Sequence, residues 1–218
     1  MGITLLLGGE ELLADRAIFK SMAENKDSVV TQFDGTDIEI GAITDALAPS
    51  LFGENRVVVI KGIQDLSAEV SDELAEALEV KDENLDLVLW HKGGVKGKAL
   101  LEKIKKLKPK TIPCEVIKKE SEKADFIHNE FKRFGRKVTP GGAQALLNSL
   151  GSDLREMSGA ISQLATDVPG NKPIDEDDVE KFQQGRIETT GYDVADAALD
   201  GKREARSEEH TSELQSQS

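Results

Sequence analysis

Two glycine-rich stretches could form a phosphate-binding loop, the best-defined chemistry that the sequence offers. Such a loop needs G-x-x-x-x-G-K-[ST] after the first strand, because backbone amides cradle the phosphates while the lysine and the hydroxyl serve the terminal phosphate and Mg²⁺. At that position the chain reads GGEE over residues 8–11, with no lysine or hydroxyl to follow, and two carboxylates would repel a polyphosphate. The second stretch, residues 93–99, is one residue short, lacks the hydroxyl and follows the fourth predicted strand, so we interpret it as a turn. The sequence therefore argues against an intrinsic ATPase.

Other catalytic and metal-binding patterns are also missing from the sequence. The three histidines, His91, His128 and His210, are widely separated and have no cysteine or carboxylate at ligand spacing, so we expect no metal site and no cofactor. Neither G-x-G-x-x-G nor G-x-S-x-G occurs. Cys114 is the only cysteine, which excludes an internal disulfide, fits a reducing cytosol and is most simply a small core residue. No apolar run approaches the ~20 residues that span a bilayer, and no signal-peptide pattern opens the chain. We expect a cytoplasmic protein without membrane contact.

A Leu-Phe pair, Leu51-Phe52, lies between a helical pattern and an unbroken β-branched run at residues 57–60. Pro49 ends the helix, since a proline ring disfavours the helical region for the residue before it. Gly53 and Asn55 then turn the chain into the buried strand. The residues alone leave two alternatives. The pair either folds into the core or stands out as a wedge for a partner's pocket.

The charge distribution reverses locally. The net charge of −13 argues against a protein that generally coats nucleic acid. Residues 91–119, however, carry ten lysines and two glutamates. This segment is either a solvated helix face or a patch that meets nucleic acid or an acidic partner. The candidate contact residues are Lys96, Lys98, Lys105 and Lys106.

Hydrophobic periodicity predicts five strand–helix units with short links. The predicted strands are residues 3–7, 29–34, 57–60, 85–90 and 112–118, and helical patterns follow each of them, with Ser67 as an N-cap and residues 121–134 as the fifth helix. This alternation predicts an α/β fold with a five-stranded, mostly parallel, doubly wound sheet.

Helical patterns alone follow Gly135. They cover residues 140–150, 154–167 and 175–182, with Thr139 and Pro140 at a well-formed helix start. We therefore predict an α/β domain over residues 1–137 and a small three-helix lid domain over residues 138–186. A further helix begins near residue 193. The last thirteen residues, 206–218, have no apolar periodicity and look like translated sequencing adapter, so we expect the natural chain to break off near residue 205.

Several segments in this order resemble the delta subunit of bacterial DNA polymerase III, a member of the clamp-loader complex. They are GGEELLADRAI near the start, SLFGENRVVVI around residues 50–60, and the helical GSDLREMSGAISQLATDVPG and PIDEDDVEKF. Leu154-Arg155 resembles the lid-helix motif of AAA+ proteins, where an arginine can face nucleotide, although a helix-surface arginine paired with an acid is an equally good interpretation. Residues 187–205 resemble the start of the family's collar domain. The resemblance implies an AAA+/RecA-like sheet with a degenerate phosphate loop.

The resemblance also implies a function. The family inserts a Leu-Phe wedge into a hydrophobic pocket of the sliding clamp (beta) and so opens the ring for loading on primed DNA during replication. By position, the sliding-clamp binding residues would be Ser50, Leu51 and Phe52. The implied partners are the clamp, the other clamp-loader subunits and primed DNA. The alternative is a degenerate P-loop-like NTPase or nucleotide-binding regulator that uses the cleft between sheet and lid. The chain has no carboxylate triad for nucleotidyl transfer, so any polymerase activity would belong to the holoenzyme.

Overall fold

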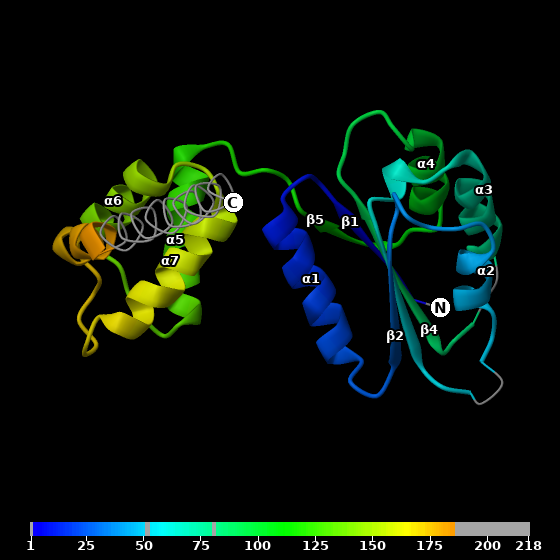
Figure 1. Ribbon diagram of the computed structural model, residues 1–218, viewed down its shortest axis with the longest axis horizontal. Helices are drawn as coiled ribbons and strands as arrows, with labels where there is room; N and C mark the ends of the chain where they lie inside the picture. Colours follow the sequence, from blue (N-terminus) through cyan, green and yellow to red (C-terminus); the bar gives the residue numbers. More distant parts are fainter. Residues whose placement is uncertain (1, 51–52, 80–81, 186–218) are drawn as a thin grey trace, which may run out of the picture. The chain divides into compact units, whose positions relative to one another are not determined.

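The structure is a computed structural model that describes residues 2–50, 53–79 and 82–185 (Figure 1). The chain divides between Ile117 and Lys118 into two compact units. The first contains the sheet. In the second, the described residues form helices and one isolated β-bridge between Val138 and Ile174. Leu51 and Phe52, the predicted collar start at 187–205 and the predicted adapter tail at 206–218 lie outside the described residues.

The α/β unit contains five parallel strands in the order β2-β3-β4-β1-β5. The strands are β1 (Gly2–Leu7), β2 (Val29–Asp34), β3 (Arg56–Lys61), β4 (Leu85–His91) and β5 (Lys110–Pro113). The helices are α1 (Glu11–Glu24), α2 (Ala42–Leu47), α3 (Ala68–Ala77) and α4 (Lys98–Lys106), with a short 3₁₀ turn η1 (Ile63–Asp65). The parallel, doubly wound α/β fold expected from the sequence is confirmed.

Two apolar layers bury the sheet from both faces. On one face, β-strand residues such as Leu87 and Leu89 pack with α2, α3 and α4. On the other face, Val57 and Val59 pack with Ile18 of α1. Figure 1 shows α1 on one side of the sheet and α2, α3 and α4 on the other. Burial on both faces explains why β3 and β4 read as continuous apolar runs rather than alternating ones.

Strand β5 differs from its prediction. It covers Lys110–Pro113 instead of residues 112–118, and it pairs only with β1, over Thr4–Leu7. The amide of Cys114 still donates to Leu7 O (2.7 Å), and Cys114 O then accepts the amide of Glu10 (2.8 Å). That second bond turns the backbone toward the α1 entry, so the chain leaves the sheet after Cys114.

The helical unit contains α5 (Glu120–Arg133), α6 (Pro140–Leu150), α7 (Leu154–Asp167) and a further helical stretch over residues 176–185. The predicted helix start holds, because Thr139 Oγ1 accepts the amide of Gly142 (3.0 Å) at the N-terminus of α6. Helix α5 contacts α6 and α7, and its Phe126, Ile127 and Phe131 are buried. The division of the chain thus precedes α5, whereas the sequence pattern predicts a boundary at residue 137. None of the described helices is long and apolar enough to cross a membrane.

Candidate functional site

Segment 50–52 connects α2 to β3. Pro49 precedes it and Gly53 follows it; of its own residues Ser50 is described, while Leu51 and Phe52 lie outside the described residues. The amide of Gly53 donates to Ser50 O (3.4 Å), and Gly53 has φ 68°. A positive φ favours glycine, so the residue type fits this position. The described elements on either side of segment 50–52 are α2 and β3.

Helix α2 is held at its N-terminus by a residue from another helix. Its N-cap, Gly41, has no side chain to accept the first amides. The carboxylate of Glu73 in α3 accepts them instead, from Gly41 (3.0 Å) and from Thr44 (2.6 Å). Burial raises the pKa of Glu73, but the hydrogen bonds from Thr44 and Gly41 outweigh burial and hold that pKa below its ordinary value. Glu73 is therefore an ionised N-terminal cap of α2 that a different helix, α3, supplies.

The C-terminus of α2 is held from β3. One guanidinium nitrogen of Arg56 donates to Ala46 O (3.0 Å) and to Ala48 O. The other pairs with Asp82 Oδ2 (2.7 Å), and both side chains are mostly buried, at 12% and 14% exposure. The Asn84 amide, together with Arg56, keeps the pKa of Asp82 below its ordinary value. Arg56 thus binds the last carbonyls of α2, which favour a positive charge.

A shallow hollow lies beside this helix. It has a volume of about 360 Å³ and is lined mainly by apolar atoms of α2, α3 and the chain after α2. The lining residues are Thr44, Leu47, Ala48, Pro49, Glu73, Glu76 and Ala77. An apolar surface therefore extends as far as Pro49, the residue before segment 50–52.

The turn after β1 stands where a phosphate loop would stand, and its amides are engaged. The amide of Gly8 donates to His91 O (3.0 Å), and that of Glu10 donates to Cys114 O (2.8 Å). Trp90 Nε1 donates to Gly8 O (2.9 Å). Gly8 has φ 133°, and a Cβ there would lie 2.1 Å from Cys114 O. The turn is therefore bonded to β4 and to the end of β5, and these two amides do not face a ligand.

The second glycine-rich stretch forms a turn around a buried histidine. His91 Nδ1 accepts the amide of Gly93 (2.9 Å), and Nε2 lies 3.0 Å from Lys96 O, to which it donates in the neutral tautomer. Gly97 packs so closely on η1 that a Cβ would lie 2.7 Å from the Cα of Gln64. Backbone groups of this stretch, the Gly93 amide and Lys96 O, are thus hydrogen-bonded to the ring of His91. This agrees with the prediction that the stretch is a turn.

The four candidate lysines lie at two separate places. Lys96 is in the turn before α4, where it pairs with Asp65 (2.7 Å), and Lys98 begins α4. Lys105 and Lys106 lie in the last turn of the helix, and Lys105 pairs with Glu102 (3.2 Å). At 1.5 Å rise per residue, the two pairs are separated along α4 by roughly 12 Å. The structure therefore shows two exposed basic positions at opposite ends of one helix.

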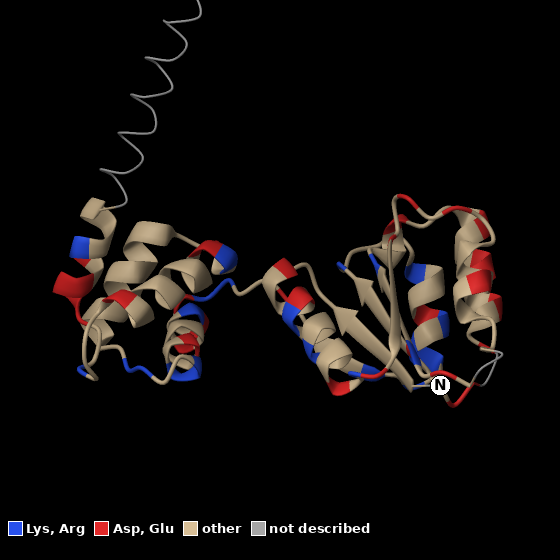
Figure 2. Ribbon diagram, turned by 60° about the horizontal axis from the view of Figure 1, so that its bottom comes forward, with Lys and Arg blue, Asp and Glu red and all other residues tan. Residues whose placement is uncertain are grey.

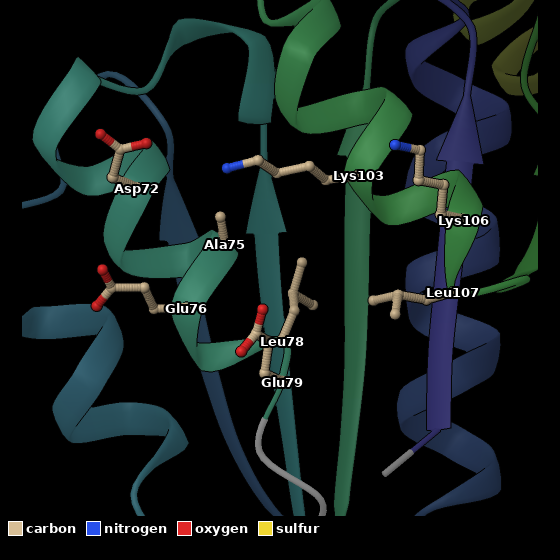
Figure 3. A pocket seen from close by; sticks show the side chains of 8 residues that line it. All are labelled: Asp72, Ala75, Glu76, Leu78, Glu79, Lys103, Lys106 and Leu107. Atoms are coloured by element: carbon tan, nitrogen blue, oxygen red, sulfur yellow. The ribbon is translucent and has the colours of Figure 1, made fainter.

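A charged groove between α3 and α4 was not anticipated from the sequence. It has a volume of about 410 Å³, with three carboxylates on the α3 side and two lysines on the α4 side. Figure 3 shows Lys103 extending toward α3 and the side chains of Leu78 and Leu107 facing each other. Figure 2 shows the same contrast, with red segments along α3 beside blue segments on α4. The lining residues are Asp72, Ala75, Glu76, Leu78, Glu79, Lys103, Lys106 and Leu107. The sequence signals for it are the spacing of Asp72 and Glu76 on one helix and that of Lys103 and Lys106 on the other.

The remaining candidates bring no further chemistry into this site. Within the described residues, no group of three or more histidines, cysteines or carboxylates is placed to hold a metal ion. Cys114 is buried, and burial raises the pKa of its thiol, so it is a core residue. Arg155 is exposed near the start of α7, in the helical unit.

Comparisons with solved structures show which fold the chain shares. Bacillus subtilis DNA clamp loader delta protein (YqeN) superposes with a TM-score of 0.62 at 22% identity, over 83% of this chain and 57% of that one. The Thermotoga maritima RuvB Holliday junction branch migration motor superposes with a TM-score of 0.54 at 16% identity, over 84% of this chain and 61% of that one. The chain therefore has the AAA+-like fold shared by clamp-loader subunits and RuvB. It spans about three fifths of the length of these proteins.

A comparison with family models shows to which family the chain belongs. The model of the DNA polymerase III delta subunit matches residues 6–116, which is just over half of the chain. The chain belongs to the DNA polymerase III delta subunit family. No match was found among curated proteins.

Proposed function

We propose that this chain is a clamp-loader subunit that binds a sliding clamp through Ser50, Leu51 and Phe52 and opens it for loading on primed DNA. The match of the delta-subunit family over residues 6–116 carries this proposal, because the matched range includes segment 50–52. The name of the Bacillus subtilis relative, a DNA clamp loader delta protein, agrees with this assignment.

The physical chemistry of the segment supports binding of this kind. A leucine and a phenylalanine that become buried in a partner's pocket each contribute roughly 1.5–3 kcal/mol. Adjacent anchors of this size commonly form the centre of an interface hot spot. The apolar hollow next to Pro49 extends the apolar surface that a clamp would cover.

The experiment is capture of a purified bacterial sliding clamp by the full chain. The double variant Leu51→Ala with Phe52→Ala should lose clamp binding, because both anchors are removed. Its melting temperature should stay close to that of the unsubstituted chain, because the pair faces a partner instead of the core. A matched control is Val95→Ala with Leu107→Ala, which truncates two exposed apolar residues elsewhere and should leave capture unchanged. A large loss of melting temperature in the Leu51/Phe52 variant would assign the pair to the core and contradict the proposal.

The engaged amides after β1 support a clamp-binding module over an NTPase. A phosphate loop works by presenting free backbone amides, and here the Gly8 and Glu10 amides donate to the neighbouring backbone. A titration with ATP and Mg²⁺ separates the two functions. Saturable binding with turnover would favour the nucleotide-dependent alternative, whereas clamp capture without nucleotide favours the module.

A further inference from the structure

Two residues, Ala48 and Pro49, separate helix α2 from segment 50–52, and the helix is too short to be stable without tertiary contacts. It has six residues, and isolated helices of fewer than ~12 residues are marginal in water because nucleation is costly. The Gly41 N-cap offers no side-chain acceptor. The position of α2 therefore depends on contacts from the rest of the α/β unit.

Those contacts come from two other elements of the unit, α3 and β3. Glu73 accepts two amides at the start of α2, from 29 and 32 residues away in sequence. At the end of α2, Arg56 donates to Ala46 O and Ala48 O, and Asp82 anchors its guanidinium. Charge-assisted hydrogen bonds of this kind are about twice as strong as neutral ones. Both ends of the helix are thus held by ionised side chains of opposite sign, each matched to the helix dipole.

The Arg56–Asp82 pair joins β3 to the chain before β4 and directs the guanidinium toward the end of α2. The Nε atom of Arg56 is buried without a hydrogen-bond partner in the described structure, which is a cost to the fold. The bonds that do form all serve the end of α2 or orient the arginine toward it. Asp82 itself is held by the amide of Asn84 (2.9 Å), at the start of β4.

We propose that Arg56, anchored by Asp82, and Glu73 are positioning residues that fix both ends of α2, the helix before segment 50–52, and thereby strengthen clamp binding. This inference rests on the proposed clamp-binding function. Preorganisation lowers the entropy lost on association, so loosening α2 weakens binding without removing a contact to the partner.

The decisive variant is Arg56→Gln, with Arg136→Gln as its matched control. Arg136 lies in the helical unit and has a similar set of backbone contacts: it donates to Ala165 O and Val168 O (both 2.8 Å), and its Nε is also buried without a partner. Its other terminal nitrogen donates to Lys172 O (3.5 Å), where Arg56 has the carboxylate of Asp82. Both substitutions remove a partly buried arginine from backbone carbonyls. Arg56→Gln should weaken clamp affinity about tenfold or more, as loss of a charge-assisted hydrogen bond suggests. Arg136→Gln should leave clamp affinity within about twofold.

Hydrogen exchange gives a readout that needs no clamp. In Arg56→Gln the amides of α2, including that of Ala48, should exchange faster, while those of β3 and β4 keep their protection. If Arg56→Gln fails to fold, Glu73→Ala tests the same inference from the other end of α2, with the same expected loss of affinity and faster exchange in α2.

The outcomes separate this inference from the proposed function. Clamp binding by the unsubstituted chain that Arg56→Gln and Glu73→Ala leave intact would overturn the positioning role alone. Unchanged exchange in α2 would overturn it as well. Failure of the unsubstituted chain to bind a clamp would overturn both proposals together.

Discussion

His91 is a buried ionisable residue at the carboxyl end of β4, with both ring nitrogens hydrogen-bonded to backbone atoms of the following turn. The Nδ1 atom accepts from Gly93, so it must carry no proton, and protonation would break that bond. Burial lowers the pKa of His91 below its ordinary value of 6.5, although the bond to Lys96 O opposes the shift. The neutral imidazole is therefore part of the fold.

This histidine should make stability depend on pH. Because its pKa is lower in the folded state, the unfolded chain binds the proton first as the pH falls below about 6.5. The contribution of His91 to the free energy of unfolding is thus complete above pH 6.5 and decreases from there down to its folded-state pKa. Urea unfolding between pH 7.5 and 5 should show this slope, and His91→Gln should reduce it. A slope that His91→Gln leaves unchanged would refute the assignment.

At the scale of elements, the turn between β1 and α1 occupies the position of a phosphate loop, but its Gly8 and Glu10 amides donate to the backbone at the ends of β4 and β5. Gly8 is the residue on which this turn depends, because its φ of 133° and its approach to Cys114 O both exclude a Cβ. The turn thereby brings β1, β4 and the end of β5 together through backbone hydrogen bonds.

Gly8→Ala should destabilise the α/β unit by more than about 2 kcal/mol, since strain at a disfavoured φ and a severe backbone contact add together. The adjacent Gly9→Ala is a close control. A Cβ at Gly9 meets nothing nearer than Lys92 O at 3.4 Å, so this variant should lose well under half as much. Chemical denaturation of both variants measures the difference. Equal losses would mean that the turn adapts to a side chain at either position.

At the scale of the whole molecule, charge limits any contact with DNA. A net charge of −13 disfavours approach to a polyanion, so contact would require a local basic surface. The last turn of α4 offers Lys105 and Lys106 at adjacent positions, and the groove beside it is acidic on the α3 side. A DNA role for the lysine-rich segment is therefore a proposal about one end of α4.

Charge reversal tests that proposal. Lys105→Glu with Lys106→Glu should weaken binding of a primed DNA duplex and reduce the slope of log affinity against log salt by about 2, one unit for each lost phosphate contact. Lys20→Glu with Lys26→Glu changes the net charge equally on the exposed side of α1 and just beyond it, and should have a smaller effect. Affinity that is independent of salt and unchanged by the α4 variant would remove this segment as a DNA contact.

Much of the fold followed from local patterns in the sequence. Helices α6 and α7 have the predicted bounds, and the N-caps Ser67 and Thr139 accept the expected amides. The predicted end of the fifth strand, at residue 118, is wrong. The apolar residues Val116 and Ile117 follow the last strand pairing, so their residue type alone suggests a longer strand than forms. Position in a sheet depends on partner strands, and a single segment does not encode where its partners end.

The sequence by itself determined the alternation of strands and helices, the missing lysine and hydroxyl after the first strand, and the proline and glycine that bracket segment 50–52. These features depend on residue type and near neighbours, so short-range physics is sufficient. Only the tertiary structure showed that α5 packs with α6 and α7, that α3 and α4 form a charged groove, and that Glu73 and Arg56 hold α2 at its two ends. Each of these contacts joins different elements of the fold, whether 8 residues apart, as for Arg56 and Ala48, or 32, as for Glu73 and Gly41, and the order of strands and the packing of helices decide which of them meet.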